Sequence, residues 1–289
     1  MSLIEEAAKR LRQLQEAGVG VSGHGESNLA SLRRERAEPR VRAAEPNPAQ
    51  FRSLDLARLQ AAGFITPSLQ DGKLLHDFRV IKRPLIQHAL GRTATQALNR
   101  NLVMVTSALP GEGKTFVAIN LAMSLAMEVD GRVLLVDADV VSPSVPDVLG
   151  IEPAKGLMDV LVQPNALFEE AVLGTSVERL TLLLAGTAHA GASELLASEA
   201  MTRLLAEVSR RYPDRIVVFD SPPLLATTES RVLATHMGQV VVVVEAERTT
   251  HAVLESALSM LESCPVVHTL LNKAPDSRVH GYYGYGYGA

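Results

Sequence analysis

From about residue 100 onward, short runs of apolar residues alternate with longer segments in which apolar residues recur at helical spacing. Six of the runs have the length of a strand, at 102–106, 132–137, 180–184, 215–220, 239–244 and 266–271. Several, such as 240–244, are apolar at every position, which is typical of parallel strands covered by helices on both faces. The pattern predicts an α/β fold with a doubly wound, mostly parallel sheet flanked by helices.

The two ends of the chain have different patterns. Ile4, Ala7, Leu11 and Leu14 fall on one helical face, which predicts an amphipathic helix over residues 1–17 that packs on its own domain or docks onto a partner. Residues 18–53 are rich in Gly, Ser, Arg, Glu and Pro and are predicted to be a disordered linker. The folded domain is expected over 54–275, followed by a flexible tail at 276–289.

Composition narrows the classes of function. The net charge of −4 and the sequence pI of about 6.1 give no reason to expect nucleic acid as a partner. A single cysteine, Cys264, excludes an internal disulfide and favours a reducing compartment. The first residues lack the basic and apolar blocks of a signal peptide. We therefore expect a cytoplasmic protein that reaches the inner face of a membrane, if at all, through a partner.

The segment after the first apolar run is Ser107-Ala-Leu-Pro-Gly-Glu-Gly-Lys-Thr115, and a helical pattern follows it. A strand, a glycine-rich loop and a helix in this order form the loop that wraps nucleotide phosphates. Gly111 and Gly113 allow backbone N–H groups to turn inward, Lys114 can reach the β- and γ-phosphates, and the Thr115 hydroxyl can ligate Mg²⁺. The sequence predicts a nucleoside triphosphate site contacted by Pro110, Gly111, Glu112, Gly113, Lys114, Thr115 and Phe116.

Two other apolar runs end in aspartate. Residues 133–136 lead into Asp137-Ala-Asp139, and residues 216–219 lead into Asp220-Ser-Pro-Pro. A carboxylate at a buried strand end is unfavourable unless it meets a cation. Of Asp137 and Asp139, one could hold Mg²⁺ through water while the other accepts a proton from an attacking hydroxyl. The alternative is that each aspartate only caps the next turn.

These three elements resemble the Walker A, A′ and B motifs of the bacterial tyrosine kinases (BY-kinases), over about residues 70–275. The chain is most similar to the tyrosine autokinases of exopolysaccharide and PEP-CTERM gene clusters, whose membrane chain-length regulator is a separate polypeptide. The resemblance implies ATP and Mg²⁺ as cofactors, with Lys114, Asp137 and Asp139 catalytic and with Thr115, Asp137, Asp139 and Asp220 near the metal. It also places Asn272 near the adenine ring, although a turn-forming asparagine is equally plausible.

The resemblance extends to assembly. Relatives form ring-like homo-oligomers through a helix that usually reads Glu-x-x-Arg-x-x-Arg, and the nearest match here is His76-x-x-Arg79-x-x-Lys82. Relatives usually have Arg two positions after the second aspartate of the A′ motif, where this chain has Val141. A ring of this chain, activated by a separate membrane polysaccharide co-polymerase, is the expected assembly.

Four of the five tyrosines lie in the last eight residues, at Tyr282, Tyr283, Tyr285 and Tyr287. The intervening glycines disfavour a stable helix or packed strand, so the segment is expected to be a flexible substrate that reaches the active site of another subunit. Each phosphate would add about −1.5 to −2 charges, which could separate neighbouring subunits. The alternative is a low-complexity end with no chemistry.

The leading hypothesis is thus an ATP-dependent protein-tyrosine autokinase that regulates exopolysaccharide synthesis or export. A partition or positioning ATPase is the first alternative, although such proteins usually carry a lysine early in the loop, where this chain has Leu109. The second alternative is a non-catalytic, nucleotide-sensing adaptor.

Overall fold

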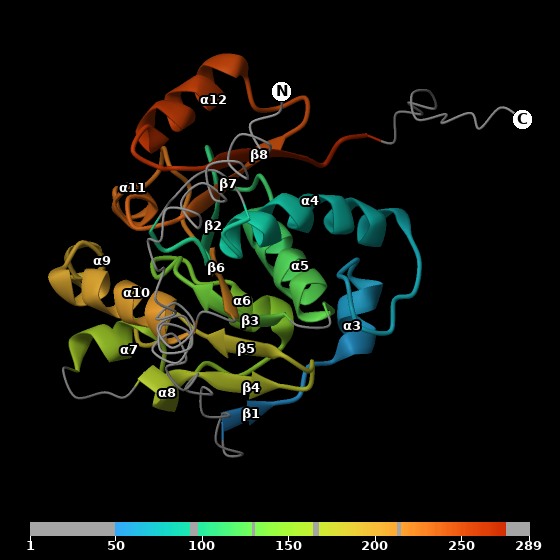
Figure 1. The fold of residues 1–289 in the computed structure, drawn as a ribbon, viewed down its shortest axis with the longest axis horizontal. Coiled ribbons are helices and arrows are strands. Elements are labelled where there is room, and N and C mark those ends of the chain that lie inside the picture. Colours follow the sequence, from blue (N-terminus) through green and yellow to red (C-terminus); the bar gives the residue numbers. More distant parts are fainter. Residues whose placement is uncertain (1–49, 93–97, 129–130, 164–167, 213–214, 276–289) are drawn as a thin grey trace, which may run out of the picture. The chain divides into compact units, whose positions relative to one another are not determined.

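The fold comes from a computed structural model, which describes residues 50–92, 98–128, 131–163, 168–212 and 215–275. The predicted sheet is present and mostly parallel, with the strand order β1-β4-β5-β3-β6-β2-β7-β8 (Figure 1). Its strands are β1 (Phe51–Arg52), β2 (Leu102–Ser107), β3 (Arg132–Asp137), β4 (Leu173–Thr175), β5 (Leu180–Leu183), β6 (Arg215–Asp220), β7 (Gln239–Glu245) and β8 (Val267–Asn272). The β4–β5 pair is antiparallel, and the other neighbouring pairs are parallel.

The helices that cover the sheet in the described residues come mainly from the segments between its strands. They are α3 (Leu56–Ala61), α4 (Lys73–Ala89), α5 (Lys114–Ala126), α6 (Val145–Leu149), α7 (Leu157–Val162), α8 (Phe168–Ala171), α9 (Ala192–Leu196), α10 (Glu199–Arg211), α11 (Glu229–Ala234) and α12 (His251–Leu258), which continues into a 3₁₀ turn at Ser259–Leu261. No helix among the described residues is both long and apolar enough to span a bilayer.

The two faces of the sheet form two separate hydrophobic cores, because successive side chains of a strand point to opposite faces. In β2, Leu102 and Met104 belong to the core that includes α7 and α9 to α12, whereas Val103 and Val105 belong to the core that includes α3 to α6. All four side chains are fully buried. This two-sided burial explains why the central strands are apolar at every position, and it confirms the doubly wound prediction.

The first strand corrects the predicted boundary of the linker. Phe51 and Arg52 fall within the range 18–53 expected to be disordered, yet they pair with Gly174 and Thr175 of β4. The N–H of Leu54 donates to the Ser176 hydroxyl at 3.0 Å, which extends the attachment. The ordered domain therefore begins by residue 50. The predicted helix over residues 1–17 and the tail lie outside the described residues.

Candidate active site at the carboxyl edge of the sheet

Strand register brings the predicted acidic residues together. Asp137 ends β3 and Asp220 ends β6, and the two are direct partners in the parallel β3–β6 ladder. On its other side β6 pairs with β2, where Val105 lies opposite Asp220 just before the glycine-rich loop. The carboxylates and the loop therefore share one edge of the sheet, where open α/β sheets bind ligands.

The loop from Ala108 to Gly113 has the conformation that a phosphate cradle requires. Gly111 and Gly113 have φ values of 85° and 95°, in the left-handed region that favours glycine. A Cβ atom at Gly113 would lie 2.2 Å from Nδ2 of Asn272, so a larger residue would displace the Asn272 side chain. No side chain caps the start of α5, which leaves the N–H groups of its first turn available to an anion.

Two residues at the end of β8 hold the carbonyl side of this loop. Nδ2 of Asn272 donates to the Glu112 carbonyl at 2.9 Å, and Nζ of Lys273 donates to the Gly111 carbonyl at 2.7 Å. We call Asn272 and Lys273 the outer clamp. When a peptide carbonyl is held outward, the N–H of the same peptide unit points the opposite way, because the unit is planar. The outer clamp thus helps aim the loop N–H groups inward.

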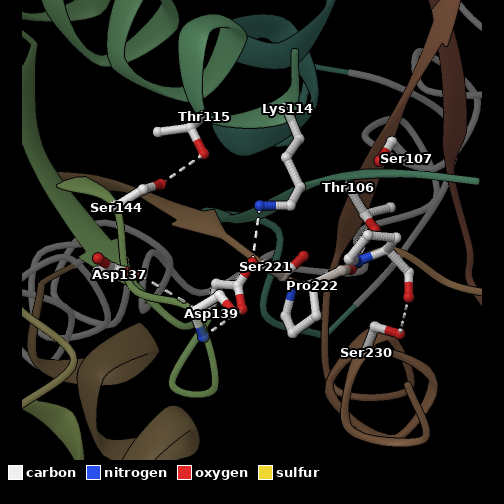
Figure 2. Close-up of polar contacts among 12 residues, drawn as sticks. Thr106, Ser107, Lys114, Thr115, Asp137, Asp139, Ser144, Ser221, Pro222 and Ser230 are labelled. Carbon is white, nitrogen blue, oxygen red and sulfur yellow. Dashed lines mark hydrogen bonds and ion pairs between the residues drawn. The ribbon is translucent and has the colours of Figure 1, made fainter. Parts of the chain in front are cut away.

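Lysine and aspartate pair at the centre of the site (Figure 2). Nζ of Lys114 lies 2.7 Å from Oδ2 of Asp139, and both side chains are largely buried. The carboxylate of Asp137 accepts the N–H groups of Asp139 at 3.3 Å and Val145 at 3.1 Å. By contrast, neither oxygen of Asp220 accepts a hydrogen bond of regular geometry from a described residue, although Asp220 is fully buried.

The clustered carboxylates perturb one another. Burial, reinforced by the charge of Asp220, raises the pKa of Asp137 to about 7. Burial raises the pKa of Asp220 to about 6, and the charge of Lys114 and the Thr115 hydroxyl act to lower it. Burial acts to lower the pKa of Lys114, but the charges of Asp220, Asp139 and Asp137 outweigh it, so the pKa is raised. Lys114 therefore stays charged, but its single positive charge does not neutralise the three carboxylates around it.

Comparison with known proteins agrees with the geometry of the site, because the matches are P-loop proteins. A family model described as ParA, NUBPL iron-transfer P-loop NTPase, matches residues 99–269. The tyrosine-protein kinase YwqD of Bacillus subtilis is 34% identical over 186 residues, which cover 63% of this chain and 77% of that protein. The chain belongs to the bacterial tyrosine kinases.

Two further comparisons show which part of the relatives this kinase covers. The tyrosine-protein kinase wzc of Salmonella typhimurium is 31% identical over 198 residues, and the chain covers 27% of that longer protein. In three dimensions, the VpsO kinase domain matches with a TM-score of 0.59 and 31% identity, covering 70% of this chain and 96% of that domain. The similarity thus spans the ParA-like P-loop domain, in which the candidate site lies.

The site of the kinase fits a divalent cation bound with nucleotide phosphates. A buried carboxylate without hydrogen-bond donors is strongly unfavourable, and a cation beside it relieves that cost. Asp220 comes close to this case, because within the described part of the chain it accepts no hydrogen bond of regular geometry and only the Thr115 hydroxyl, at the start of α5, acts as a donor to it. Magnesium uses one or two carboxylates together with phosphate oxygens and water, so this donor set suits it.

Several predicted contacts of the kinase have additional roles in the fold. The Glu112 carboxylate turns into the protein, where it accepts the Leu109 N–H at 2.7 Å and the Thr249 hydroxyl. The Phe116 ring packs on Phe64 with the ring centroids 5.0 Å apart. Pro110 is exposed at the tip of the loop. These residues therefore shape the loop from the protein side, and their contacts to a nucleotide stay predictions.

Lys82, the last residue of the match to the assembly motif, is buried and not on the surface. Its Nζ donates to the Ser124 carbonyl at 2.7 Å and pairs with Glu128 at 2.6 Å, and the residue is 6% exposed. Lys82 therefore joins α4 to the end of α5 within one molecule. Val141 is 60% exposed, and the four tail tyrosines lie outside the described residues.

One residue at the site gave no signal in the sequence. The Ser144 hydroxyl lies 3.0 Å from the Thr115 hydroxyl, across 29 positions of the chain. Thr106 contributes a second contact of this kind, because its hydroxyl donates to the Pro222 carbonyl at 2.8 Å and ties the loop after β6 to β2. Local spacing could not reveal either contact, since both depend on the packing of separate strands.

Proposed function

We propose that the kinase transfers the γ-phosphoryl group of ATP to its own C-terminal tyrosines, Tyr282, Tyr283, Tyr285 and Tyr287, in a neighbouring subunit. The observation that carries the proposal is the buried Asp220 carboxylate, which accepts no hydrogen bond of regular geometry from a described residue and lies beside Thr115 and the Lys114–Asp139 pair at a glycine-rich loop. Magnesium bound to ATP would place a positive charge beside the Asp220 carboxylate and would stabilise the transferring phosphoryl group.

The residues of the site divide this work. The loop N–H groups and Lys114 bind the phosphates, and Lys114 stabilises negative charge that develops during transfer. Asp139 orients Lys114 through their 2.7 Å contact. The tyrosine oxygen forms the new bond to the γ-phosphorus while the bond from that phosphorus to the β–γ bridging oxygen breaks and ADP leaves. The tyrosine proton passes to Asp137, whose pKa of about 7 suits a general base at neutral pH. The chain-length protein of the membrane would be the activator, and polysaccharide synthesis or export the regulated process.

The direct test is incubation of purified protein with labelled ATP and Mg²⁺, followed by mapping of phosphotyrosine by mass spectrometry. We expect label in the tail tyrosines. Replacing all four by Phe should remove most of the label, whereas the matched variant Tyr212→Phe should keep it, because Tyr212 is buried in the domain core. Lys114→Met should abolish transfer.

Mixing two variants tests transfer between subunits. Lys114→Met supplies an intact tail without activity, and a chain lacking residues 276–289 supplies activity without a tail. Label in the Lys114→Met chain of the mixture would show transfer in trans. If Lys114→Met labels itself when alone, the site assignment is wrong. Nucleotide hydrolysis without phosphotyrosine would favour the positioning ATPase, and tight ATP binding without transfer, even with the membrane activator, would favour the adaptor.

A further inference from the structure

Ser144 occupies the N-cap position of α6 but does not cap it. Serine is among the preferred N-cap residues because its hydroxyl accepts an N–H of the first turn, which stabilises the helix. Ser198 and Thr250 do this at α10 and α12, where they accept the N–H groups of Met201 and Val253. Ser144 makes no such bond. Its hydroxyl instead contacts Thr115, as Figure 2 shows.

The start of α6 is held by another group. The Asp137 carboxylate accepts the Val145 N–H at 3.1 Å, directly after Ser144. Asp137 thus satisfies the first N–H of α6, a different donor from the one an N-cap side chain accepts, and holds the backbone next to Ser144. A position that breaks a local rule while a distant residue compensates for it is typical of a functional site.

The contact restricts the hydroxyl of Thr115. Threonine in a helix divides between two rotamers, because its hydroxyl can also bond to a carbonyl of the preceding turn. A partner 3.0 Å away in a separate segment favours the rotamer that turns the hydroxyl toward the start of α6, where it also acts on Asp220. Magnesium demands nearly ideal octahedral geometry, so a ligand that is already oriented binds it more tightly.

We propose that Ser144 is a positioning residue, which holds the Thr115 hydroxyl in the orientation that ligates a nucleotide-bound Mg²⁺ ion. This inference rests on the proposed function, because it assumes that Thr115 is a metal ligand. It adds a residue outside the Walker A, A′ and B motifs, and it gives Asp137 a second, structural role in the same site.

The test compares two nearly isosteric variants that differ in one hydroxyl, Ser144→Thr and Ser144→Val. Calorimetry measures ADP binding with and without Mg²⁺. In the wild type and in Ser144→Thr, Mg²⁺ should tighten ADP binding by the same factor. In Ser144→Val that factor should fall roughly fivefold, the effect of losing one neutral hydrogen bond, while metal-free ADP binding stays unchanged. Ser142→Ala, in the exposed part of the same loop, is the control and should behave as wild type.

Thermal unfolding separates positioning from a purely structural role. Because Ser144 forms no cap bond, Ser144→Val should lose only its contact with Thr115 and melt no more than about 4 °C below the Ser142→Ala control. If Mg²⁺ tightens ADP binding by the same factor in Ser144→Thr and Ser144→Val, the proposal is overturned. The proposal is also overturned if Ser144→Val weakens metal-free ADP binding as much as it weakens binding with Mg²⁺. If Mg²⁺ has no effect on ADP binding in the wild type, the metal site of the proposed function is itself wrong.

Discussion

Asp220→Asn should make the metal-free protein more stable, although it removes a residue of the active site. The pKa of Asp220 is about 6 in the fold against 3.8 for an ordinary aspartate, and one pKa unit corresponds to about 1.4 kcal/mol. The ionised carboxylate therefore costs up to about 3 kcal/mol above pH 6. Asparagine has nearly the same shape and no charge, and Asp220 has no regular hydrogen bond to lose.

The sign of the pH dependence follows from the raised pKa. The folded state retains the Asp220 proton up to about pH 6, whereas the unfolded state loses it near pH 4, so the wild type loses stability as the pH rises through this window. The advantage of Asp220→Asn should be largest near pH 8 and should vanish as the pH falls toward 4.

Urea denaturation of nucleotide-free protein in a chelator, at pH 8 and at pH 5, measures the effect. Asp71→Asn is a suitable control, because Asp71 is exposed in the loop before α4. With Mg²⁺ and ADP the order should reverse, since ligand stabilisation depends on affinity for the folded state. A metal-free Asp220→Asn protein that is no more stable than wild type at pH 8 would refute the reasoning.

Three further predictions address the clamp, the helix pair and the core. Lys273→Met should weaken ADP binding roughly tenfold in calorimetry, the order expected for losing one hydrogen bond from a charged group, while the exposed Lys155→Met should not. Lys82→Met should lower the free energy of unfolding by about 1.5–3 kcal/mol in urea, whereas Arg79→Met, exposed on the same helix, should have little effect. Met104→Ala should cost about 2–5 kcal/mol in the same assay, because it leaves a cavity in the centre of the sheet.

Most of the strands that the sequence predicts well are buried on both faces, and the half-exposed edge strand β8 is the exception. β7 reads as an unbroken apolar run, and its position follows from that run alone. β1 and β4 have two and three residues, too few for a periodic signal, and they exist because they pair with each other and with β5. Strands as short as these depend on tertiary pairing, so the sequence pattern does not reveal them.

The same distinction holds at the site. The carboxylates and the glycine-rich loop were predictable, because a strand followed by a fixed pattern of residues places them at one edge of the sheet. Ser144 and Lys273 were not, and the resemblance placed Asn272 at the site without revealing its bond to the loop, since these contacts join segments 29 and at least 160 positions apart. Lys82 matches the assembly motif of relatives in sequence but is buried within one molecule, because its place in a helix pattern does not show whether the side chain turns inward.

The order of synthesis gives the outer clamp a further consequence. Lys273 is synthesised 162 residues after Gly111, whose carbonyl it holds, and Asn272 is synthesised 160 residues after Glu112. A nascent chain that ends before β8 has the complete glycine-rich loop but neither anchor, and β7 still has a free edge. The affinity of the growing polypeptide for nucleotide should therefore rise once Lys273 has left the ribosome, so that the kinase binds nucleotide tightly only when its domain is nearly complete.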